Sequence, residues 1–351
     1  MRIGQMTGQG DGGMVWAEQT GDAMQFVADI RDIGTPHPQR RTLTDPGAAA
    51  IVFEREMLSR VEAVLRAHSG TPVVLLSGGV DSILVAAAAV RLGVRPHALT
   101  VVARGGTDGE NAAAAADALG LTHELVELDD RAVAGLAGEA VRLLGIAELW
   151  EISYAIPLLA ALPALDRLEV GPILTGSGAD AIAGGGKAIR HPAGSPQATE
   201  ELDRIIRDES DRNFRYRRLV PDFYARVMGR YADRFVLVFQ TLRFWDAAET
   251  MAAPVFFGER LGEQVDKLCI RMACEALLPE NAKHLAWAKK SAIQRSAGIM
   301  GALAGAARDH AASLPGARTY SDPGTEPFDA VATRLYLALL DAQQQQAPQS
   351  P

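Results

Sequence analysis

The stretch Val73–Ser82, which reads VVLLSGGVDS, decides the fold predicted for this chain. Its first four residues are apolar, as in a buried strand, and the Ala-rich residues 83–90 that follow favour a helix. The glycine turn between them lets backbone N–H groups approach an anion, and the helix dipole favours negative charge there. Because Asp81 would repel a phosphate directly, it is better explained as a ligand of Mg²⁺ that bridges carboxylate and phosphates. A glycine turn that only closes a strand–helix unit is the alternative.

The motif Ser77-Gly78-Gly79-Val80-Asp81-Ser82 resembles the pyrophosphate loop of the ATP pyrophosphatase superfamily. That superfamily includes asparagine synthetase, GMP synthetase, NAD synthetase and argininosuccinate synthetase. It is not a Walker A loop, because the only comparable Gly186-Lys187 pair is followed by Ala and preceded by Ala181 in place of the first Gly. The resemblance implies an α/β fold of the adenine nucleotide alpha hydrolase type, with a parallel sheet, flanking helices and a mainly helical C-terminal part.

Composition sets the broad class of the protein. With 351 residues, 48% of them hydrophobic, the chain can form one large or two modest domains. The net charge of −8 argues against a nucleic-acid surface. Two cysteines, Cys269 and Cys274, indicate a reducing compartment and are expected in a helix core. Because we find no signal peptide and no apolar stretch of membrane-spanning length, we expect a cytoplasmic protein.

Strands and helices are expected to alternate in the first half of the chain, which indicates a parallel sheet with right-handed crossovers. A helix capped by Thr44 or Asp45, with Pro46 in its first turn, precedes the first strand. The expected strands are 73–76, 97–103, 122–128 and 171–175, and the expected helices are 46–67, 83–90, 110–119, 131–144 and 152–165.

Larger divisions follow from the same pattern. Residues 1–44, rich in Gly, Asp, Thr and Pro, predict an irregular arm. A mobile loop is expected at 181–200 and a disordered Gln- and Pro-rich tail at 342–351. The synthetase-like domain is expected at 45–310, with an α/β nucleotide-binding core over 72–180 and a mainly helical part over 200–310.

A second motif follows the fourth expected strand. Residues 175–180 read TGSGAD, with Gly184-Gly185 just beyond, and are similar to the asparagine synthetase element S/T-G-x-G-A-D-E-x-x-G-G. The resemblance makes Asp180 a second magnesium ligand beside the ATP triphosphate. Asp81 and Asp180 both stand just past the carboxyl ends of expected parallel strands, where open α/β sheets bind their ligands. We therefore expect these two carboxylates to lie together and to hold one or two Mg²⁺ ions.

A lysine-bearing stretch provides the other catalytic candidates. Leu278-Pro279-Glu280 and the following residues 286–294 (AWAKKSAIQ) look like the C-terminal segment of the family. In the family a lysine there stabilises charge on the adenylate and the departing pyrophosphate, as a compact cation can. Lys290 is the first choice by register and Lys289 the second, with Asp81 as the third catalytic residue. An ordinary exposed lysine pair is the alternative.

ATP is the cofactor that the resemblance implies, together with Mg²⁺. Its adenine is expected near Leu75, Val102 and Gly176. The residues expected to bind it are Leu75, Ser77, Gly78, Gly79, Asp81, Ser82, Val102, Thr175, Gly176 and Asp180.

Two further stretches resemble the family. Residues 107–111 (TDGEN) and 118–124 (ALGLTHE) match its acidic cluster and Leu-Gly-x-x-His, although a helix cap explains Asp108 and Glu110 equally well. Residues 151–157 (EISYAIP) match the segment before its substrate-side helix more loosely.

Several positions depart from the asparagine synthetase pattern. Ser177 stands where that enzyme carries Glu, Ala181 replaces the Glu after the Asp, and residues 250–254 (TMAAP) replace Glu-x-Arg-x-Pro. These changes lie on the acceptor side and argue against aspartate as the substrate. Since residue 2 is Arg and no room for a glutaminase domain precedes the ATP loop, we also expect that domain to be lacking.

The expected function is an ATP-dependent, AMP- and pyrophosphate-forming amide synthetase. A small-molecule carboxylate would be adenylated and passed to ammonia or an amine, with a separate glutaminase subunit as one source of ammonia. Neither a membrane nor a nucleic-acid partner is expected, and a homodimer is one assembly left open. The alternatives are an intramolecular lactam-forming synthetase, a tRNA- or base-modifying enzyme of the superfamily, and a non-catalytic nucleotide-binding subunit.

Overall fold

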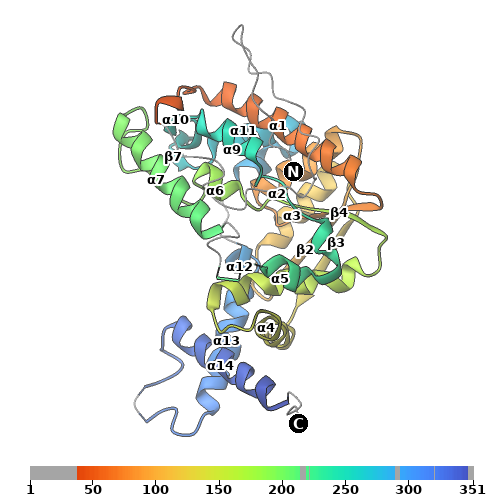
Figure 1. Cartoon of the computed structure of the whole chain (residues 1–351), viewed down its shortest axis with the longest axis vertical. Coiled ribbons are helices and arrows are strands. Elements are labelled where there is room, and N and C mark those ends of the chain that lie inside the picture. Colours follow the sequence, from red (N-terminus) through yellow and green to blue (C-terminus); the bar gives the residue numbers. More distant parts are fainter. Residues whose placement is uncertain (1–37, 214–218, 221, 289–292, 320, 347–351) are drawn as a thin grey trace, which may run out of the picture.

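The computed structural model describes residues 38–213, 219–220, 222–288, 293–319 and 321–346. Within these residues the centre is a five-stranded sheet in the order β3-β2-β1-β4-β5, in which every neighbouring pair of strands is parallel. The expected parallel sheet with flanking helices is therefore confirmed (Figure 1). The strands are β1 (Thr71–Leu75), β2 (His97–Ala103), β3 (His123–Leu128), β4 (Val170–Thr175) and β5 (Phe235–Leu237).

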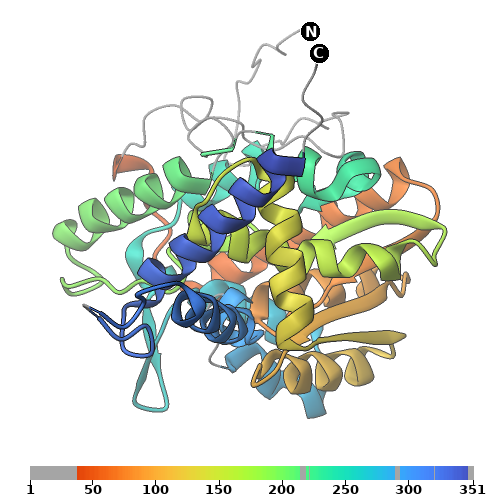
Figure 2. The same cartoon turned by 90° about the horizontal axis from the view of Figure 1, so that it is seen from below.

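Two layers of helices cover the two faces of the sheet (Figure 1). One layer contains α1 (Pro46–Ala67), α2 (Val80–Arg91), α3 (Asp108–Leu119), α6 (Ala179–Ala183), α7 (Pro196–Asn213), α9 (Leu242–Glu249), α10 (Ala253–Phe256), α11 (Leu268–Leu277) and the 3-10 helix η4 (Glu280–Trp287). The other contains α4 (Asp130–Leu144), α5 (Leu149–Leu165), α8 (Phe223–Met228), α13 (Ile299–Ser313) and α14 (Phe328–Gln346). In Figure 2, seen from below, the blue helices α13 and α14 lie toward the viewer.

The inner strands β1, β2 and β4 are largely apolar on both faces, because each face supports its own core, whereas the edge strand β3 carries Glu124 and Glu127. In β1, Val73 packs with α4 and α5 while its neighbour Val74 packs with α1 and α2. Both side chains are fully buried. Successive side chains of a strand point to opposite faces, so a strand covered on both sides has no polar alternation. The unbroken apolar run before Ser77 follows from this position in the middle of the sheet.

Helix boundaries follow local signals in the sequence. Asp45 caps α1 by accepting a hydrogen bond from Ala48 N at 2.6 Å, and Pro46 opens the helix, as predicted. Gly120 closes α3 in the left-handed conformation with φ 62°, also as predicted. The helix begins at Asp108, two residues before the expected start.

The segment before α1 is tied to the second half of the chain. Arg41 is buried and forms an ion pair with Asp203 of α7 at 2.5 Å. Its Nη1 also donates to the carbonyls of Ala248 and Met251, and Leu43 pairs with Met251 as an isolated bridge. This part of the expected arm is therefore a packed strap that begins with the 3-10 turn Pro38–Arg40 (η2), while residues 1–37 lie outside the described part of the chain.

Several sequence-based boundaries were wrong. Helix α7 begins at Pro196, inside the expected loop 181–200, and α6 occupies the start of that loop. The part over 200–310 is mainly helical, as expected, and it also contains β5, preceded by the 3-10 turn η3 (Gly229–Arg234), and a hairpin of β6 (Gly258–Arg260) and β7 (Glu263–Val265). Helix α14 continues to Gln346, so the expected disordered tail does not begin at residue 342, and residues 347–351 lie outside the description.

Both cysteines lie on the core side of a helix, as expected from the sequence. Cys269 and Cys274 are free and buried in α11, and burial raises the pKa of both thiols. Among the described residues, no single helix has both the length and the apolar character needed to cross a membrane. Within that part of the chain, the pair α4 and α5, bent by 112° at their junction, passes the test on length and composition alone.

Candidate active site

The two glycine motifs meet because of the order of the strands. From β1 the chain moves outward to β2 and β3, then returns to place β4 on the other side of β1. The loops after β1 and β4 therefore flank a topological switch point, where open α/β sheets have a crevice. The loop after β1 is the phosphate loop (Ser77–Ser82), and the loop after β4 is called the β4 loop (Gly176–Asp180).

The phosphate loop is held by its own serines. Ser82 Oγ donates to Gly79 O at 3.0 Å and accepts from Ser77 N at 3.1 Å. Gly78 has φ 71°, and a Cβ there would lie 2.9 Å from the backbone of α3, so only glycine fits. Gly79 is the N-cap of α2 without a side-chain cap, so the first N–H groups of this 12-residue helix face the loop. This arrangement suits an anion.

Thr100 and His123 support the strand end just before the phosphate loop. Thr100 Oγ1 donates to the carbonyl of Leu76 at 2.6 Å and therefore accepts from His123 Nε2 at 2.8 Å. Burial, and then the nearby His97, lower the pKa of His123 below its usual value. The histidine of the Leu-Gly-x-x-His stretch thus acts through Thr100 on the backbone that precedes Ser77.

The β4 loop packs directly on the phosphate loop. A Cβ on Gly176 would lie 2.7 Å from Ser82 N and 2.9 Å from Asp81 Cβ, so the two backbones touch only because residue 176 is glycine. Gly178 has φ 100°, and a Cβ there would lie 2.4 Å from Gln240 Cγ. Gly176 and Gly178 therefore each allow a particular close approach.

Asp81 and Asp180 converge on one ammonium group. Lys267 Nζ donates to Asp81 Oδ1 at 3.0 Å, to Asp81 Oδ2 at 2.8 Å and to Asp180 Oδ1 at 2.8 Å. The side chain of Lys267 is 9% exposed, against 20% for Asp81 and 61% for Asp180. We call this group the Asp–Lys–Asp cluster. The structure therefore brings together the two carboxylates that the sequence places at separate strand ends.

Electrostatics keep Lys267 charged. Burial alone would lower its pKa, but the charges of Asp81 and Asp180 and the hydrogen bonds to them outweigh burial and raise the pKa above its ordinary value. Buried ion pairs need such multiple partners to offset the loss of hydration. Lys267 is therefore a fixed positive charge between two carboxylates.

Sequence reasoning missed Lys267, because its unusual features appear only in the structure. Lys267 is the N-cap residue of α11, with φ 51° and no side-chain cap. A cation at a helix N-terminus opposes the helix dipole, and the left-handed conformation is unfavourable for lysine. A residue that breaks two local preferences is expected at a functional site.

The glycines after Asp180 make room for the cluster. Gly184 has φ 62° and ends α6. A Cβ on Gly185 would lie 1.8 Å from Asp180 Oδ1 and 3.0 Å from Lys267 Cδ. Any side chain at position 185 would therefore displace Asp180 or Lys267.

Asp266, the residue before Lys267, binds two other segments through its carboxylate. Its Oδ2 accepts from Gly186 N at 2.6 Å, and its Oδ1 accepts from Arg271 Nη2 at 2.9 Å. Burial would raise the pKa of Asp266, but these donors and the charges of Lys267 and Arg271 lower it. Asp266 thus links the glycine turn after α6 to the start of α11.

A hydroxyl cluster lies on the other side of the β4 loop. Tyr154 OH lies 3.1 Å from Ser177 Oγ and 3.3 Å from Tyr224 OH. The ring of Tyr154, on α5, stacks on Phe223, and the ring of Tyr224, on α8, stacks on Phe235. The loosely matched segment 151–157 thus contributes a tyrosine beside the position where the pattern departs from asparagine synthetase.

The other residues predicted to bind the nucleotide differ in how far they are buried. Val102 is buried in β2 and Leu75 is partly buried at the end of β1. Thr175 is buried, and its hydroxyl donates to Val236 O of β5 at 3.1 Å. An adenine position near Leu75, Val102 and Gly176 stays a prediction.

Lys289 and Lys290 lie outside the described residues. On one side of them, Arg271 Nη1 donates to the carbonyls of Ala286 and Ala288. On the other side, after α12 (Ile293–Ser296), the Ala297 carbonyl accepts from Ala103 N at 2.6 Å, at the carboxyl end of β2. The chain therefore reaches the same edge of the sheet just after these lysines, and their catalytic role stays a prediction.

Metal-binding potential rests on Asp81 and Asp180. No group of three or more His, Cys, Asp or Glu side chains that could hold a metal is found among the described residues. Mg²⁺ in nucleotide sites uses one or two carboxylates and completes its shell with phosphates and water. The Lys267 ammonium shows that one cation can contact both Asp81 and Asp180. These two carboxylates therefore fit a shared Mg²⁺ of a nucleotide complex.

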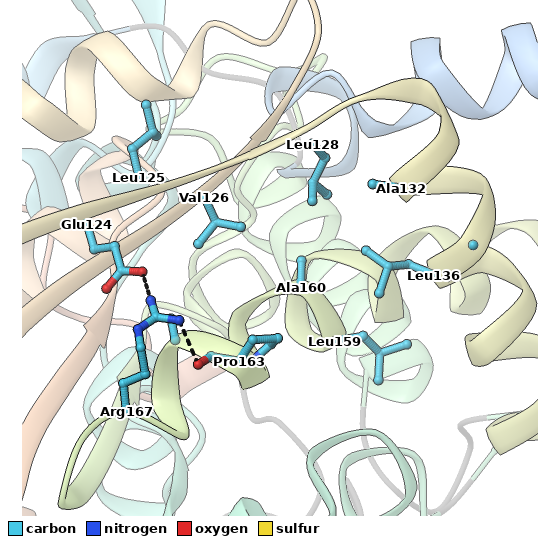
Figure 3. A pocket seen from close by; sticks show the side chains of 12 residues that line it. Glu124, Leu125, Val126, Leu128, Ala132, Leu136, Leu159, Ala160, Pro163 and Arg167 are labelled. Atoms are coloured by element: carbon cyan, nitrogen blue, oxygen red, sulfur yellow. Dashed lines mark hydrogen bonds and ion pairs between the residues drawn. The ribbon is translucent and has the colours of Figure 1, made fainter.

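Two of the hollows formed by the described residues lie outside the clusters. One, of about 690 Å³, lies between the β6–β7 hairpin and the residues after α6, and Asp266 and Arg271 line it. The other, of about 570 Å³, is an apolar groove between the edge strand β3 and helices α4 and α5, shown in Figure 3. An ion pair between Glu124 and Arg167 closes one end of this groove.

The sheet, the glycine loops and the strand-end carboxylates define an α/β protein of the nucleotide-hydrolase-like class. The family model for asparagine synthase matches residues 61–251, more than half of the chain. The chain belongs to the asparagine synthase family, a family of ATP-dependent amide-forming synthetases. No curated protein matches the sequence. The matched region contains Asp81 and Asp180 and ends before Lys267.

Proposed function

We propose that this protein forms AMP and pyrophosphate from ATP while it activates a small carboxylate and passes the acyl group to ammonia or an amine. Family membership supports ATP use and amide formation in general. The observation that carries the finer proposal is the convergence of Asp81 and Asp180 on one cation position beside the phosphate loop.

In each step of this reaction a new bond to the electrophilic atom forms as a leaving group departs. First, a carboxylate oxygen bonds to the α-phosphorus while the bond to the bridging oxygen breaks, and pyrophosphate leaves with that electron pair. Then the amine nitrogen bonds to the acyl carbon, AMP leaves with the electrons of the broken bond, and the nitrogen loses a proton. Both steps depend chiefly on alignment and on neutralising charge at phosphate oxygens.

The residues divide this work between them. The phosphate loop and the first N–H groups of α2 bind the triphosphate oxygens. Asp81 and Asp180 would hold Mg²⁺, which would supply charge neutralisation at the phosphates. Lys290, with Lys289 as the second choice, follows the negative charge onto the departing pyrophosphate.

The acceptor side supports a substrate other than aspartate. Ser177 replaces the glutamate of the asparagine synthetase pattern, and its hydroxyl lies beside those of Tyr154 and Tyr224. A hydroxyl does not attract a substrate ammonium group as a carboxylate does. An acid with a hydroxyl, an amide or an aromatic ring suits this wall better.

The direct test is pyrophosphate release from MgATP with a panel of carboxylic acids, with and without ammonia or amines. We expect release that depends on one class of acid and stops in Asp81→Ala. The matched control is Asp117→Ala, which removes an exposed carboxylate from α3 and should behave as the unaltered protein. Full activity of Asp81→Ala would rule out the assignment.

The same assay separates the alternatives. A product that forms without an added amine, from an acid that carries its own amine, favours the lactam-forming reaction. Thiolated or otherwise modified RNA favours the base-modifying reaction. Magnesium-dependent ATP binding without pyrophosphate release under any acceptor favours a non-catalytic subunit.

A further inference from the structure

Lys267 saturates the position where the two carboxylates meet. An ammonium group has three N–H donors, and here they reach both oxygens of Asp81 and one oxygen of Asp180, all between 2.8 and 3.0 Å. The side chain is almost fully buried, so this is not a loose surface contact. In the described structure a cation that belongs to the chain therefore already offsets part of the charge of the two carboxylates.

A divalent cation needs the same oxygens. Mg²⁺ binds carboxylate oxygens at about 2.0–2.1 Å and tolerates little distortion of its shell. It could not bind the inner oxygens of Asp81 and Asp180 while the Lys267 ammonium remained within 3 Å of them, because two positive charges would lie almost in contact. The two cations are therefore alternative occupants of one position.

The surroundings favour a lysine that can leave. Lysine carries its charge on a flexible four-carbon stem with rotatable donors, so the ammonium can turn to new acceptors without a change of backbone. Its Cα is held on both sides, by Asp266 through Gly186 and Arg271 and by the start of α11. Phosphate oxygens bound at the neighbouring phosphate loop would be the nearest new acceptors for a displaced ammonium group.

We propose that Lys267 is the resident cation of the Asp81–Asp180 pair, and that a metal-bound triphosphate displaces it from the carboxylates onto phosphate oxygens. The inference rests on the proposed function, because it takes the same two carboxylates as the metal ligands. Its consequence is that the nucleotide-free protein excludes divalent cations from this position. Metal and nucleotide therefore bind as one complex and not one after the other.

The test measures Mn²⁺ binding without nucleotide, by the loss of the electron paramagnetic resonance signal of free Mn²⁺. We expect the unaltered protein to bind Mn²⁺ weakly at this position. Lys267→Asn should bind one Mn²⁺ per chain at least about tenfold more tightly, because a competing charge is gone. Asparagine suits this position because it tolerates the left-handed conformation that Lys267 adopts.

Three further variants make the result specific. Lys267→Asn combined with Asp81→Asn should lose the added Mn²⁺ site, which shows where the ion binds. Lys267→Arg keeps a cation and should exclude Mn²⁺ as the unaltered protein does. Lys283→Met removes a lysine whose partner is the exposed Glu280, and it should change nothing.

Each outcome decides the proposal. Tight binding of one Mn²⁺ to the unaltered protein, lost in Asp81→Asn, overturns it, and that measurement needs no variant at position 267. Equal, weak Mn²⁺ binding by Lys267→Asn also overturns it. If Lys267→Asn binds Mn²⁺ weakly while MgATP still yields pyrophosphate, the displacement of Lys267 is wrong and the proposed function stands. If Lys267→Asn gains the ion but no acid supports pyrophosphate release, the proposed function alone is wrong.

Discussion

Ser177 and Asp180 are three residues apart in the β4 loop, yet their side chains meet opposite chemistry. Asp180 faces a buried ammonium group and a second carboxylate. Ser177 faces the hydroxyl of Tyr154, which lies within reach of that of Tyr224. The contrast indicates that one end of the site is built for charge and the other for hydrogen bonds and aromatic surface. Under the proposed function, we expect the charged end to serve the chemistry on ATP and the hydroxyl end to select the substrate.

The largest effect should follow a change at the charged end. Asp81→Asn keeps the shape of the side chain but removes the charge that balances Lys267. We expect pyrophosphate release to fall by about a thousandfold or more, because charge stabilisation at phosphates is the main source of rate. Thermal unfolding of the variant should stay cooperative. A variant that keeps its rate would break the comparison, since the charged end would then not serve the reaction.

Crowding the charged end should have an intermediate effect. The methyl group of Gly185→Ala would overlap Asp180 Oδ1, so Asp180 must rotate away from Lys267. We expect kcat/KM for ATP to fall by about 10- to 100-fold, as misplacement of a catalytic group by about 1 Å does. Gly135→Ala on α4 is the control, because its Cβ meets no atom within 4 Å. Equal kinetics for the two variants would contradict this role of Gly185.

A smaller and more selective effect is expected at the hydroxyl end. Tyr154→Phe removes one hydroxyl and keeps the ring stacked on Phe223. We expect the KM for the carboxylate to rise by about five- to tenfold, the value of one hydrogen bond, while the KM for ATP stays the same. A variant whose KM for ATP rises as much as that for the acid would show that the two ends are not separate.

The smallest effect concerns pH and the support of the phosphate loop. The pKa of His123 is lowered in the folded protein, by burial first, so the unfolded chain binds more protons near pH 6.5. The contribution of neutral His123 to the free energy of unfolding is fully present above pH 6.5. It is lost as the pH drops below that value, because the unfolded chain takes up the proton first. Because His123 is partly exposed, we expect a loss below about 1 kcal/mol, measured by urea unfolding at pH 7.5 and 5.5. His123→Gln, which keeps a donor for Thr100, should unfold with less dependence on pH than the unaltered protein.

Much of the charged end could be predicted from the sequence. The apolar run before Ser77 and the strand–helix alternation give a parallel sheet, and the chain order β1 to β4 brings the loops that carry Asp81 and Asp180 to one edge. The signals are local: a glycine turn, a helix cap and a period of apolar residues. Such signals can be interpreted from a single stretch of sequence, whatever packs against that stretch in the fold.

The rest depends on contacts between distant parts of the chain. Lys267 is 186 residues from Asp81, and Tyr224 is 70 residues from Tyr154. Strand β5 has only three residues and stands among helices, so no window of periodicity marks it. The hydroxyl cluster follows from where β5 and α8 pack, and it could not be predicted from any single stretch of sequence.

The close packing of Gly176 on Ser82 has a consequence for how such proteins exchange parts during evolution. Two segments that are almost a hundred positions apart form one surface, because residue 176 has no side chain to hold them apart. A recombination event between residues 82 and 176 would join halves that had not been fitted to each other. Hybrids of this protein with its relatives should therefore remain functional when both loops come from the same parent, and should fail when each loop comes from a different one.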